Sequence, residues 1–367
     1  MNAIERLRAT YEFKPADHLV RREFYIWPEA IERWKTEGLP PDVPQAELFG
    51  FDDGAECGVG MLGWCEPAFV PAMTETVLEQ TADYQIVRDN AGRTVKVFTG
   101  RRHGFMPTYL KHAVTCEADW NDDVLPLLSP DTPARWEGFE QKLADLRAAD
   151  AAGKMIVLPT IGAYMYLRAL VGPEEVCFLF VDNPALIHAM IRAWLALADA
   201  VAERAQQAVE LDAVYVAEDI CYNHGLLISP AMVREFLLPY YQQLVTNIRR
   251  RQGRKRLHLQ VDTDGNCHEA VDLYRQVGLT AMTPFEVAAG NDVVDFGRRY
   301  PDLVILGGID KRILAAGPGA IDDHLDHILP AMVRRGGYIP TCDHGVPDNV
   351  SYASYMHYRR RVMEMDH

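Results

Sequence analysis

The second half of the chain alternates between short apolar runs and amphipathic stretches, and this alternation restricts the fold more than any other feature. Six runs with the length and composition of β-strands follow Lys154, and a helix-like stretch comes after each of them. The runs are Met155–Pro159, Asp212–Glu218, Leu257–Asp262, Leu279–Pro284, Leu303–Gly308 and Gly337–Pro340. Strands that alternate with helices predict a parallel sheet. With a further strand expected at His18–Ile26, eight strand–helix units are within reach.

We therefore predict one α/β domain over residues 1–367, a (β/α)8 barrel of the TIM type, in preference to a doubly wound sheet. A chain of 367 residues suits this fold, because such barrels commonly form a single domain at this length. Residues 151–367 are the expected barrel core, and residues 1–150 are an N-terminal extension with the first units.

The N-terminal extension carries its own local signals. The segments Tyr84–Arg88 and Thr94–Phe98 flank the turn sequence Asn90-Ala91-Gly92, which predicts a β-hairpin. Helices are expected at Pro28–Glu37 and at Thr132–Ala152.

Charge and cysteine content restrict the partners and the compartment. Lysine and arginine number 37 against 52 aspartates and glutamates, so the formal net charge is −15. Such a surface repels nucleic acid and anionic lipid, and we expect neither a nucleic-acid nor a membrane partner. The seven cysteines are odd in number and contain no Cys-x-x-Cys spacing, and the N-terminus lacks an apolar signal core. We expect a cytoplasmic protein.

Most of the predicted strands run into residues that can ligate a metal or transfer a proton. These residues are Glu218, Asp219, Asp262, Asp264, Glu286, Asp310, Cys342 and His344. The carboxyl ends of the strands in a parallel barrel lie on one face, which is where such barrels carry out chemistry. The repetition predicts an active site, although Asp264 beside Gly265 alone also fits a helix cap or an Asx turn.

Several of these stretches resemble the uroporphyrinogen decarboxylase superfamily, which includes corrinoid-dependent methyltransferases. The similar stretches are Glu218-Asp219, Pro239-Tyr240-Tyr241, Asp264-Gly265-Asn266, residues 284–290, residues 307–312 and residues 336–347. They lie within roughly residues 150–367, and the resemblance implies a (β/α)8 barrel. The arginine-rich Arg-Gln-Ala-Gly-Arg segment that is typical of the true decarboxylases is absent.

The resemblance also implies a metal site. The similar methyltransferases hold zinc with a His-x-Cys-Gly segment and a distant cysteine. Aligned on Gly265, the early pair is Asp262 and Asp264 here, and the distant cysteine is Cys342. A zinc site of Glu218, Asp264 and Cys342 is therefore expected, with Asp262 as an alternate ligand.

The function that the resemblance implies is a methyltransferase that uses zinc to demethylate a methyl ether, such as a methoxylated aromatic. The methyl group would pass to a corrinoid (cobalamin) carried by a partner protein. The expected catalytic residues are Asp219, His344 and Glu286. The expected substrate-binding residues are Tyr25, Trp27, Tyr164, Arg168 and Asp310, with Phe24, Trp64 and Phe105 as further aromatic walls.

Other functions stay open at this point. Methyl transfer from the corrinoid to tetrahydrofolate fits the same site. A cofactor-free decarboxylase would use Arg168, Arg101 and Arg102 to hold a carboxylate, and a barrel that only binds a ligand is a third possibility. A homodimer is possible.

Overall fold

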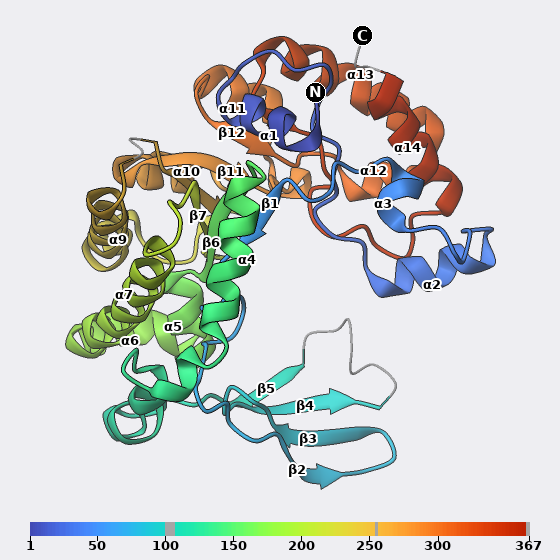
Figure 1. Ribbon diagram of the computed structural model, residues 1–367. Coiled ribbons are helices and arrows are strands. Elements are labelled where there is room, and N and C mark those ends of the chain that lie inside the picture. The colour runs from blue at the N-terminus through green and yellow to red at the C-terminus, as the bar shows by residue number, and fades with distance from the viewer. Residues whose placement is uncertain (100–106, 254–255, 365–367) are drawn as a thin grey trace.

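A curled sheet of seven parallel strands forms the centre of the computed structural model, which describes residues 1–99, 107–253 and 256–364 (Figure 1). The strands in spatial order are β1 (Glu56–Gly58), β6 (Met155–Ile161), β7 (Ala213–Ala217), β10 (His258–Asp262), β11 (Leu279–Thr283), β12 (Val304–Leu306) and β13 (Tyr338–Ile339). All six runs predicted after Lys154 are strands of this sheet, so the parallel α/β architecture is confirmed.

The register of the sheet brings the carboxyl ends of its central strands to one level. Ala217 at the end of β7 is paired with Ile161 on one side and Asp262 on the other, and Asp262 is paired with Thr283. The residues that follow these strands therefore emerge at the same face of the sheet.

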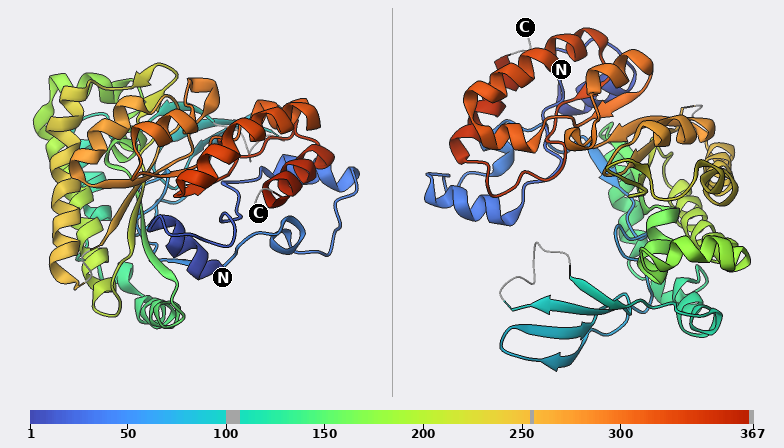
Figure 2. Two further views of the ribbon diagram at one scale, coloured as in Figure 1. Left: turned by 90° about the horizontal axis from the view of Figure 1, so that it is seen from above. Right: turned by 180° about the vertical axis from the view of Figure 1, so that it is seen from behind.

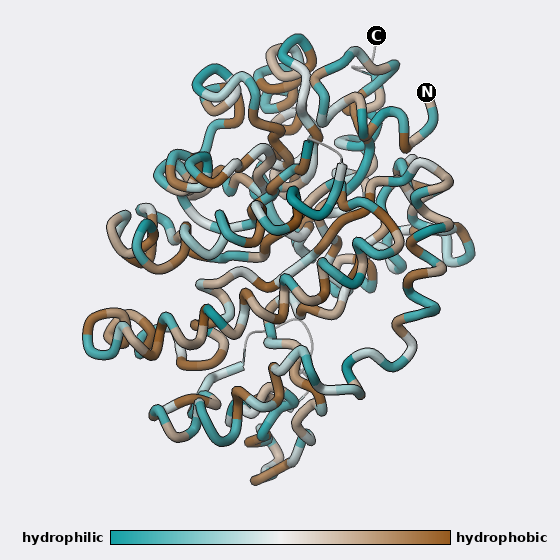
Figure 3. The backbone as a smooth tube through the Cα atoms, turned by 60° about the vertical axis from the view of Figure 1, so that its left-hand side comes forward, coloured by the Kyte–Doolittle hydropathy of each residue, from teal (hydrophilic) through white to brown (hydrophobic). Residues whose placement is uncertain are grey.

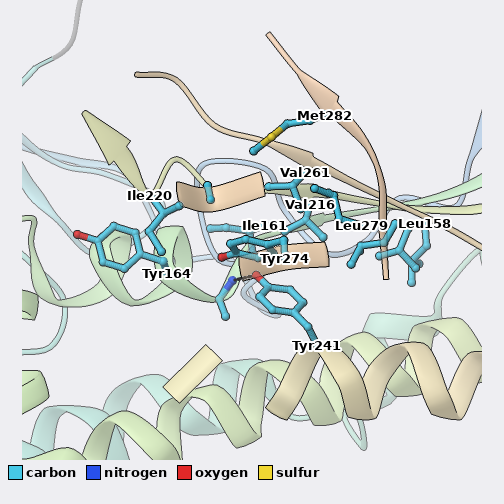
Figure 4. Packing of buried hydrophobic residues seen from close by; sticks show 14 of the residues in the cluster. Leu158, Ile161, Tyr164, Val216, Ile220, Tyr241, Val261, Tyr274, Leu279 and Met282 are labelled. Atoms are coloured by element: carbon cyan, nitrogen blue, oxygen red, sulfur yellow. Dashed lines mark hydrogen bonds between the residues drawn. The ribbon is translucent and has the colours of Figure 1, made fainter. Parts of the chain in front are cut away.

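Helices cover the outer face of the sheet (Figure 2). They are α4 (Phe139–Ala151), α5 (Ala163–Val171), α6 (Glu175–Asp182), α7 (Pro184–Gln206), α8 (Pro230–Met232), α9 (Leu238–Arg251), α10 (His268–Tyr274), α11 (Val293–Arg299), α12 (Lys311–Ala316), α13 (Pro318–Arg335) and α14 (Tyr352–Glu364). Hydrophobic and hydrophilic residues alternate along the long helices, because one side of each packs inward (Figure 3). Close packing beneath the sheet joins strand residues such as Val216 to Tyr241 of α9 and Tyr274 of α10 (Figure 4).

Helix α7 is long and apolar enough to cross a bilayer by length and composition alone. It begins where Asn183 accepts a 3.1 Å hydrogen bond from the Leu186 amide, with Pro184 in the first turn. Residues along its inner side, from Leu186 to Ala205, are buried against the rest of the fold. In this structure α7 is a core helix.

The prediction of an eighth strand at His18–Ile26 is wrong. Only an isolated bridge between Ile26 and Val346 forms there. The segment nevertheless lies between the two edges of the sheet, because Arg21 exchanges hydrogen bonds with Asp52 just before β1, while the Val346 amide after β13 donates to the Tyr25 carbonyl. One of these partners is the Asp52 side chain and not the backbone of a neighbouring strand, so no regular ladder of backbone hydrogen bonds forms. The sheet therefore has seven strands and an irregular segment in place of the expected eight strands.

The N-terminal region adds helices and a second sheet. The helices are α1 (Ala3–Tyr11), α2 (Pro28–Thr36) and α3 (Gln45–Phe49). The sheet is antiparallel, with strands β2 (Thr76–Gln80), β3 (Tyr84–Arg88), β4 (Thr94–Phe98) and β5 (Thr108–Lys111). Strands β3 and β4 form the predicted hairpin, in which Tyr84 is opposite Phe98 and Arg88 is opposite Thr94. A short hairpin of β8 (Cys221–Tyr222) and β9 (Gly225–Leu226) follows β7.

The long helix expected at Thr132–Ala152 is shorter than predicted. A 3₁₀ turn covers Pro133–Trp136, and α4 begins only after Gly138, whose φ of 74° is left-handed. This left-handed residue interrupts the helical backbone, so two separate elements form.

Candidate active site

A cavity of about 1110 Å³ opens at the carboxyl ends of the parallel strands. The residues that reach it from these ends are Ala217 and Asp219 at the end of β7, Asp262 and Asp264 at the end of β10, Thr283 of β11, Leu306 of β12, and Thr341 and His344 after β13. Further walls come from segments 22–27 and 56–66, from Arg93 in the turn between β3 and β4, and from Tyr109 of β5. The prediction that residues at the strand ends meet at one site is therefore confirmed for Asp219, Asp262, Asp264 and His344.

His344 and Asp264 form a pair at one side of the cavity. The Nε2 atom of His344 lies 3.4 Å from the Oδ2 atom of Asp264. The hydrogen bond that the His344 ring donates to Asp264 raises the pKa of His344 above its usual value, since it favours the protonated ring. Trp27 stacks on the imidazole at a centroid distance of 6.1 Å, and the Phe24 ring lies 5.7 Å away. These contacts hold the His344 ring in one orientation.

Asp219 forms an ion pair with Arg168 of α5. Burial raises the pKa of Asp219, and the guanidinium opposes that change. The backbone of Asp219 has a φ of 42°, a left-handed conformation that is uncommon for a residue other than glycine. This turn at the end of β7 points the Asp219 side chain into the cavity, and backbone strain of this kind clusters at functional sites.

Asp262 is the most deeply placed acid of the cavity. It ends β10, and its Oδ2 atom accepts a 2.8 Å hydrogen bond from the Tyr215 hydroxyl. Burial raises the pKa of Asp262 to about 7. A carboxyl with this pKa holds a proton in roughly half of the molecules at neutral pH, which suits a general acid. The ring of Trp64 stacks on Tyr215 at 4.9 Å and covers this part of the wall.

Glu23 is a cavity residue that the sequence analysis missed. Its Oε1 atom accepts a 2.6 Å hydrogen bond from the Cys342 amide, and its Oε2 atom accepts one of 3.1 Å from Tyr355. Burial raises the pKa of Glu23 to about 7. The signal in the sequence was a single acid next to the apolar run Phe24-Tyr25-Ile26-Trp27, because a carboxyl buried among such side chains needs hydrogen-bond partners.

The cavity arginines are all engaged in ion pairs within the described part of the chain. Arg22 lies 2.8 Å from Glu56, and Arg93 lies 2.7 Å from Asp89 and 3.1 Å from Glu66. Arg168 is held by Asp219, as described above.

The predicted zinc ligands do not come together. Glu218 is fully buried beneath the cavity, where the hydroxyls of Tyr241 and Tyr274 and the Tyr164 amide donate to its carboxyl. Burial raises the pKa of Glu218 to about 8, so it is mostly protonated at neutral pH. Cys342 is buried against Asp343 with its thiol pKa raised by desolvation, and it does not line the cavity.

The reason for this correction is local geometry. Adjacent residues at a strand end point to opposite sides, so Asp219 and Thr341 reach the cavity while their neighbours Glu218 and Cys342 turn away from it. Among residues 1–99, 107–253 and 256–364, no group of three or more His, Cys, Asp or Glu side chains is placed to hold a metal ion. These residues do not fit a zinc site.

The other predicted site residues divide into two groups. Tyr25, Trp27 and Arg168 line the cavity. Three residues do not: Tyr164 is buried in α5, Glu286 accepts from the Gly265 amide and from Lys311 at 2.6 Å, and Asp310 caps α12 by accepting from the Arg312 amide. These three side chains hold loops and helices in place and do not line this cavity, so their roles in catalysis and substrate binding stay predictions. Arg101, Arg102 and Phe105 lie outside the described residues.

Comparisons with known proteins give a consistent result. The family model described as uroporphyrinogen decarboxylase (URO-D) matches residues 159–364, which is more than half of the chain. Among solved structures, a methyltransferase from Methanosarcina mazei is similar with a TM-score of 0.57 and 13% sequence identity, over 99% of this chain and 98% of that chain. This similarity shows a shared fold. No curated protein matches the chain.

Proposed function

The chain belongs to the uroporphyrinogen decarboxylase family. We propose that its cavity catalyses methyl transfer, in which an aromatic methyl ether loses its methyl group. The observation that carries the proposal is Asp262, a protonatable carboxyl inside an aromatic-walled cavity. The name of the similar solved structure, a methyltransferase, supports the same class. When bound, a corrinoid on a partner protein supplies a cobalt(I) centre as the methyl acceptor.

The chemistry that the chain itself supplies is proton transfer to the leaving oxygen. Breaking the bond between oxygen and the methyl carbon leaves both bonding electrons on oxygen, as a phenolate. Asp262 donates its proton to this oxygen, so the product leaves as a neutral phenol and the carboxylate regains a proton from solvent. The Tyr215 hydrogen bond stabilises the carboxylate that forms in this step.

The ring of His344, held by Asp264, is a second group that can stabilise the leaving oxygen. The raised pKa of His344 favours the protonated ring near neutral pH, and a fixed cation near the leaving oxygen stabilises the developing negative charge. The rings of Phe24 and Trp27 hold the imidazole in place.

The walls of the cavity suit an aromatic ring. Trp64 and Tyr215 are stacked, and Tyr25 packs edge-on against Trp27 at 5.1 Å. A substrate ring that lies between these faces gains apolar burial and excludes water from the reacting oxygen.

A decarboxylase that holds its substrate by a carboxylate is the weaker proposal. Arg168, the described member of the predicted arginine set, is already paired with Asp219. Zinc has no role in the proposed reaction, because the predicted ligands do not converge. The corrinoid protein as partner, the cytoplasmic location, transfer to tetrahydrofolate and a homodimer stay predictions.

The test is a spectral assay of corrinoid methylation with purified protein, a cobalt(I) corrinoid protein and a panel of methoxylated aromatics. We expect turnover with the natural chain and a fall of about 10²- to 10⁴-fold in kcat for Asp262→Asn. The matched control is Asp326→Asn, which removes an exposed carboxylate paired with Arg361 and leaves kcat unchanged. Absence of turnover with every ether, or full activity of Asp262→Asn, contradicts the proposal.

A further inference from the structure

We propose that the cavity selects an uncharged aromatic substrate and rejects the same ring when it carries a carboxylate, with the pair Arg168–Asp219 as the specificity determinant. This inference rests on the proposed function only in taking the same cavity as the substrate site. It concerns binding, which can be measured without any methyl transfer.

The first observation is that cavity cations are matched by carboxylates. Among the described lining residues, Arg22 is paired with Glu56, Arg93 with Asp89 and Glu66, and Arg168 with Asp219. To pair with any of these three guanidiniums, an incoming carboxylate must displace the protein carboxylate that holds it. Displacement leaves a protein carboxylate without its partner in a partly desolvated site, which is costly.

The second observation is an excess of acids. The described cavity lining contains six carboxyl groups against three arginines, and the only further candidate cation is His344, which is paired with Asp264. The two acids without an arginine or histidine partner in the cavity are Glu23 and Asp262. Their carboxyl oxygens accept hydrogen bonds from Tyr355, the Cys342 amide and Tyr215. A ligand carboxylate placed beside them competes with Glu23 and Asp262 for these same hydrogen-bond donors.

The third observation is that the surfaces left for contact are ring faces. Trp27 stacks on His344, and Trp64 stacks on Tyr215, which leaves aromatic surface toward the cavity. An uncharged ring gains by burial against these faces and requires no ion pair to open.

Arg168 lies near the proposed acid site, because its partner Asp219 is close enough to Asp262 to influence the pKa of that acid. Its side chain is 24% exposed and that of Asp219 is 35% exposed, and both line the cavity. Replacing Asp219 by asparagine keeps the shape and removes the charge. The guanidinium of Arg168 is then available to a ligand carboxylate, which pairs with arginine in the same way.

The experiment compares two probes that share the ring and the methyl ether, 4-methoxybenzyl alcohol and 4-methoxybenzoate. Dissociation constants are measured by calorimetry, without corrinoid. We expect the natural chain to bind the alcohol at least ~10-fold more tightly than the benzoate. In Asp219→Asn, we expect benzoate affinity to rise ~10-fold or more, while alcohol affinity changes by less than ~3-fold.

Two further variants make the test specific. Asp302→Asn is the matched control, because it removes the carboxylate partner of Arg275 outside the cavity, and benzoate affinity should stay at the natural level. The double variant Asp219→Asn with Arg168→Gln removes both charges, and the gain in benzoate binding should disappear.

Equal or tighter binding of benzoate by the natural chain overturns the inference, as does failure of both probes to bind at millimolar concentration. Both results are independent of whether the variants fold. An unchanged benzoate affinity in folded Asp219→Asn also overturns it. The expected binding pattern together with absence of methyl transfer contradicts the proposed function alone.

Discussion

The hydroxyl of Tyr215, which lies on β7, donates a 2.8 Å hydrogen bond to the carboxyl of Asp262, which ends the adjacent strand β10. This bond crosses from one strand to its neighbour inside the barrel-like sheet. It joins an acid whose pKa is raised to about 7 to a hydroxyl that opposes this rise. The pair explains how a buried carboxyl can hold a proton near neutral pH and still release it.

Replacing Tyr215 with phenylalanine tests this relationship. The Tyr215 hydrogen bond lowers the pKa of Asp262, so its loss should raise that pKa above 7. Asp262 would then stay protonated to higher pH. The alkaline limb of the kcat/KM profile should therefore shift to higher pH by about one unit. A pH profile of methyl transfer measures the shift. An alkaline limb that stays in place or moves to lower pH contradicts the assignment of Asp262 as the acid.

Glu218 should make the fold less stable as the pH rises. Its pKa is 4.5 as an ordinary side chain and about 8 in the fold, so between these values the folded state holds a proton that the unfolded state has lost. The free energy of unfolding should therefore fall with increasing pH over this window, by roughly 1 kcal/mol per pH unit from this group. Urea unfolding from pH 5 to pH 8 measures the slope.

The matched variant for that prediction is Glu218→Gln, which keeps a neutral group between Tyr241 and Tyr274. The free energy of unfolding of this variant should fall less steeply with pH than that of the natural chain. The control Glu32→Gln alters an exposed acid paired with Lys35 and should keep the natural slope. Parallel slopes for the natural chain and Glu218→Gln contradict the buried, protonated state of Glu218.

Metal analysis should find no site that depends on Cys342. The thiol is buried with a raised pKa, and Glu218 and Asp264 are engaged elsewhere. After incubation with zinc and removal of unbound metal, the natural chain and Cys342→Ala should therefore hold the same amount of zinc. One equivalent that disappears in Cys342→Ala would restore the zinc site that the sequence implied.

Trp64 should contribute to ligand binding more than to stability. Its ring stacks on Tyr215 at 4.9 Å, and Trp64 is 41% exposed and lines the cavity. Trp64→Ala should weaken binding of an uncharged methoxylated ring by up to ~10-fold, while the midpoint of thermal unfolding changes little. Calorimetric titration checks the first effect, and Trp64→Phe, which keeps an aromatic face, should retain most of the affinity. Unchanged affinity in Trp64→Ala places the ring elsewhere in the cavity.

Local patterns in the sequence were sufficient to predict the parallel sheet. Each of the six runs after Lys154 is a strand, because a short apolar run between amphipathic stretches can bury itself only in the interior of an α/β fold. The same reasoning placed Asp219, Asp262, Asp264 and His344 at one face, since parallel strands bring their carboxyl ends together.

Only the tertiary structure decided which side chain at each strand end faces the cavity. Glu218 and Asp219 are adjacent, and the left-handed backbone of Asp219, together with the tyrosines of α9 and α10, determines that Glu218 is buried behind the site. The partners of Arg168 and Glu23 likewise come from segments far away in the chain. Sequence periodicity describes a residue within its own strand, whereas the pairing and burial of a charge depend on side chains that only the folded chain brings into contact.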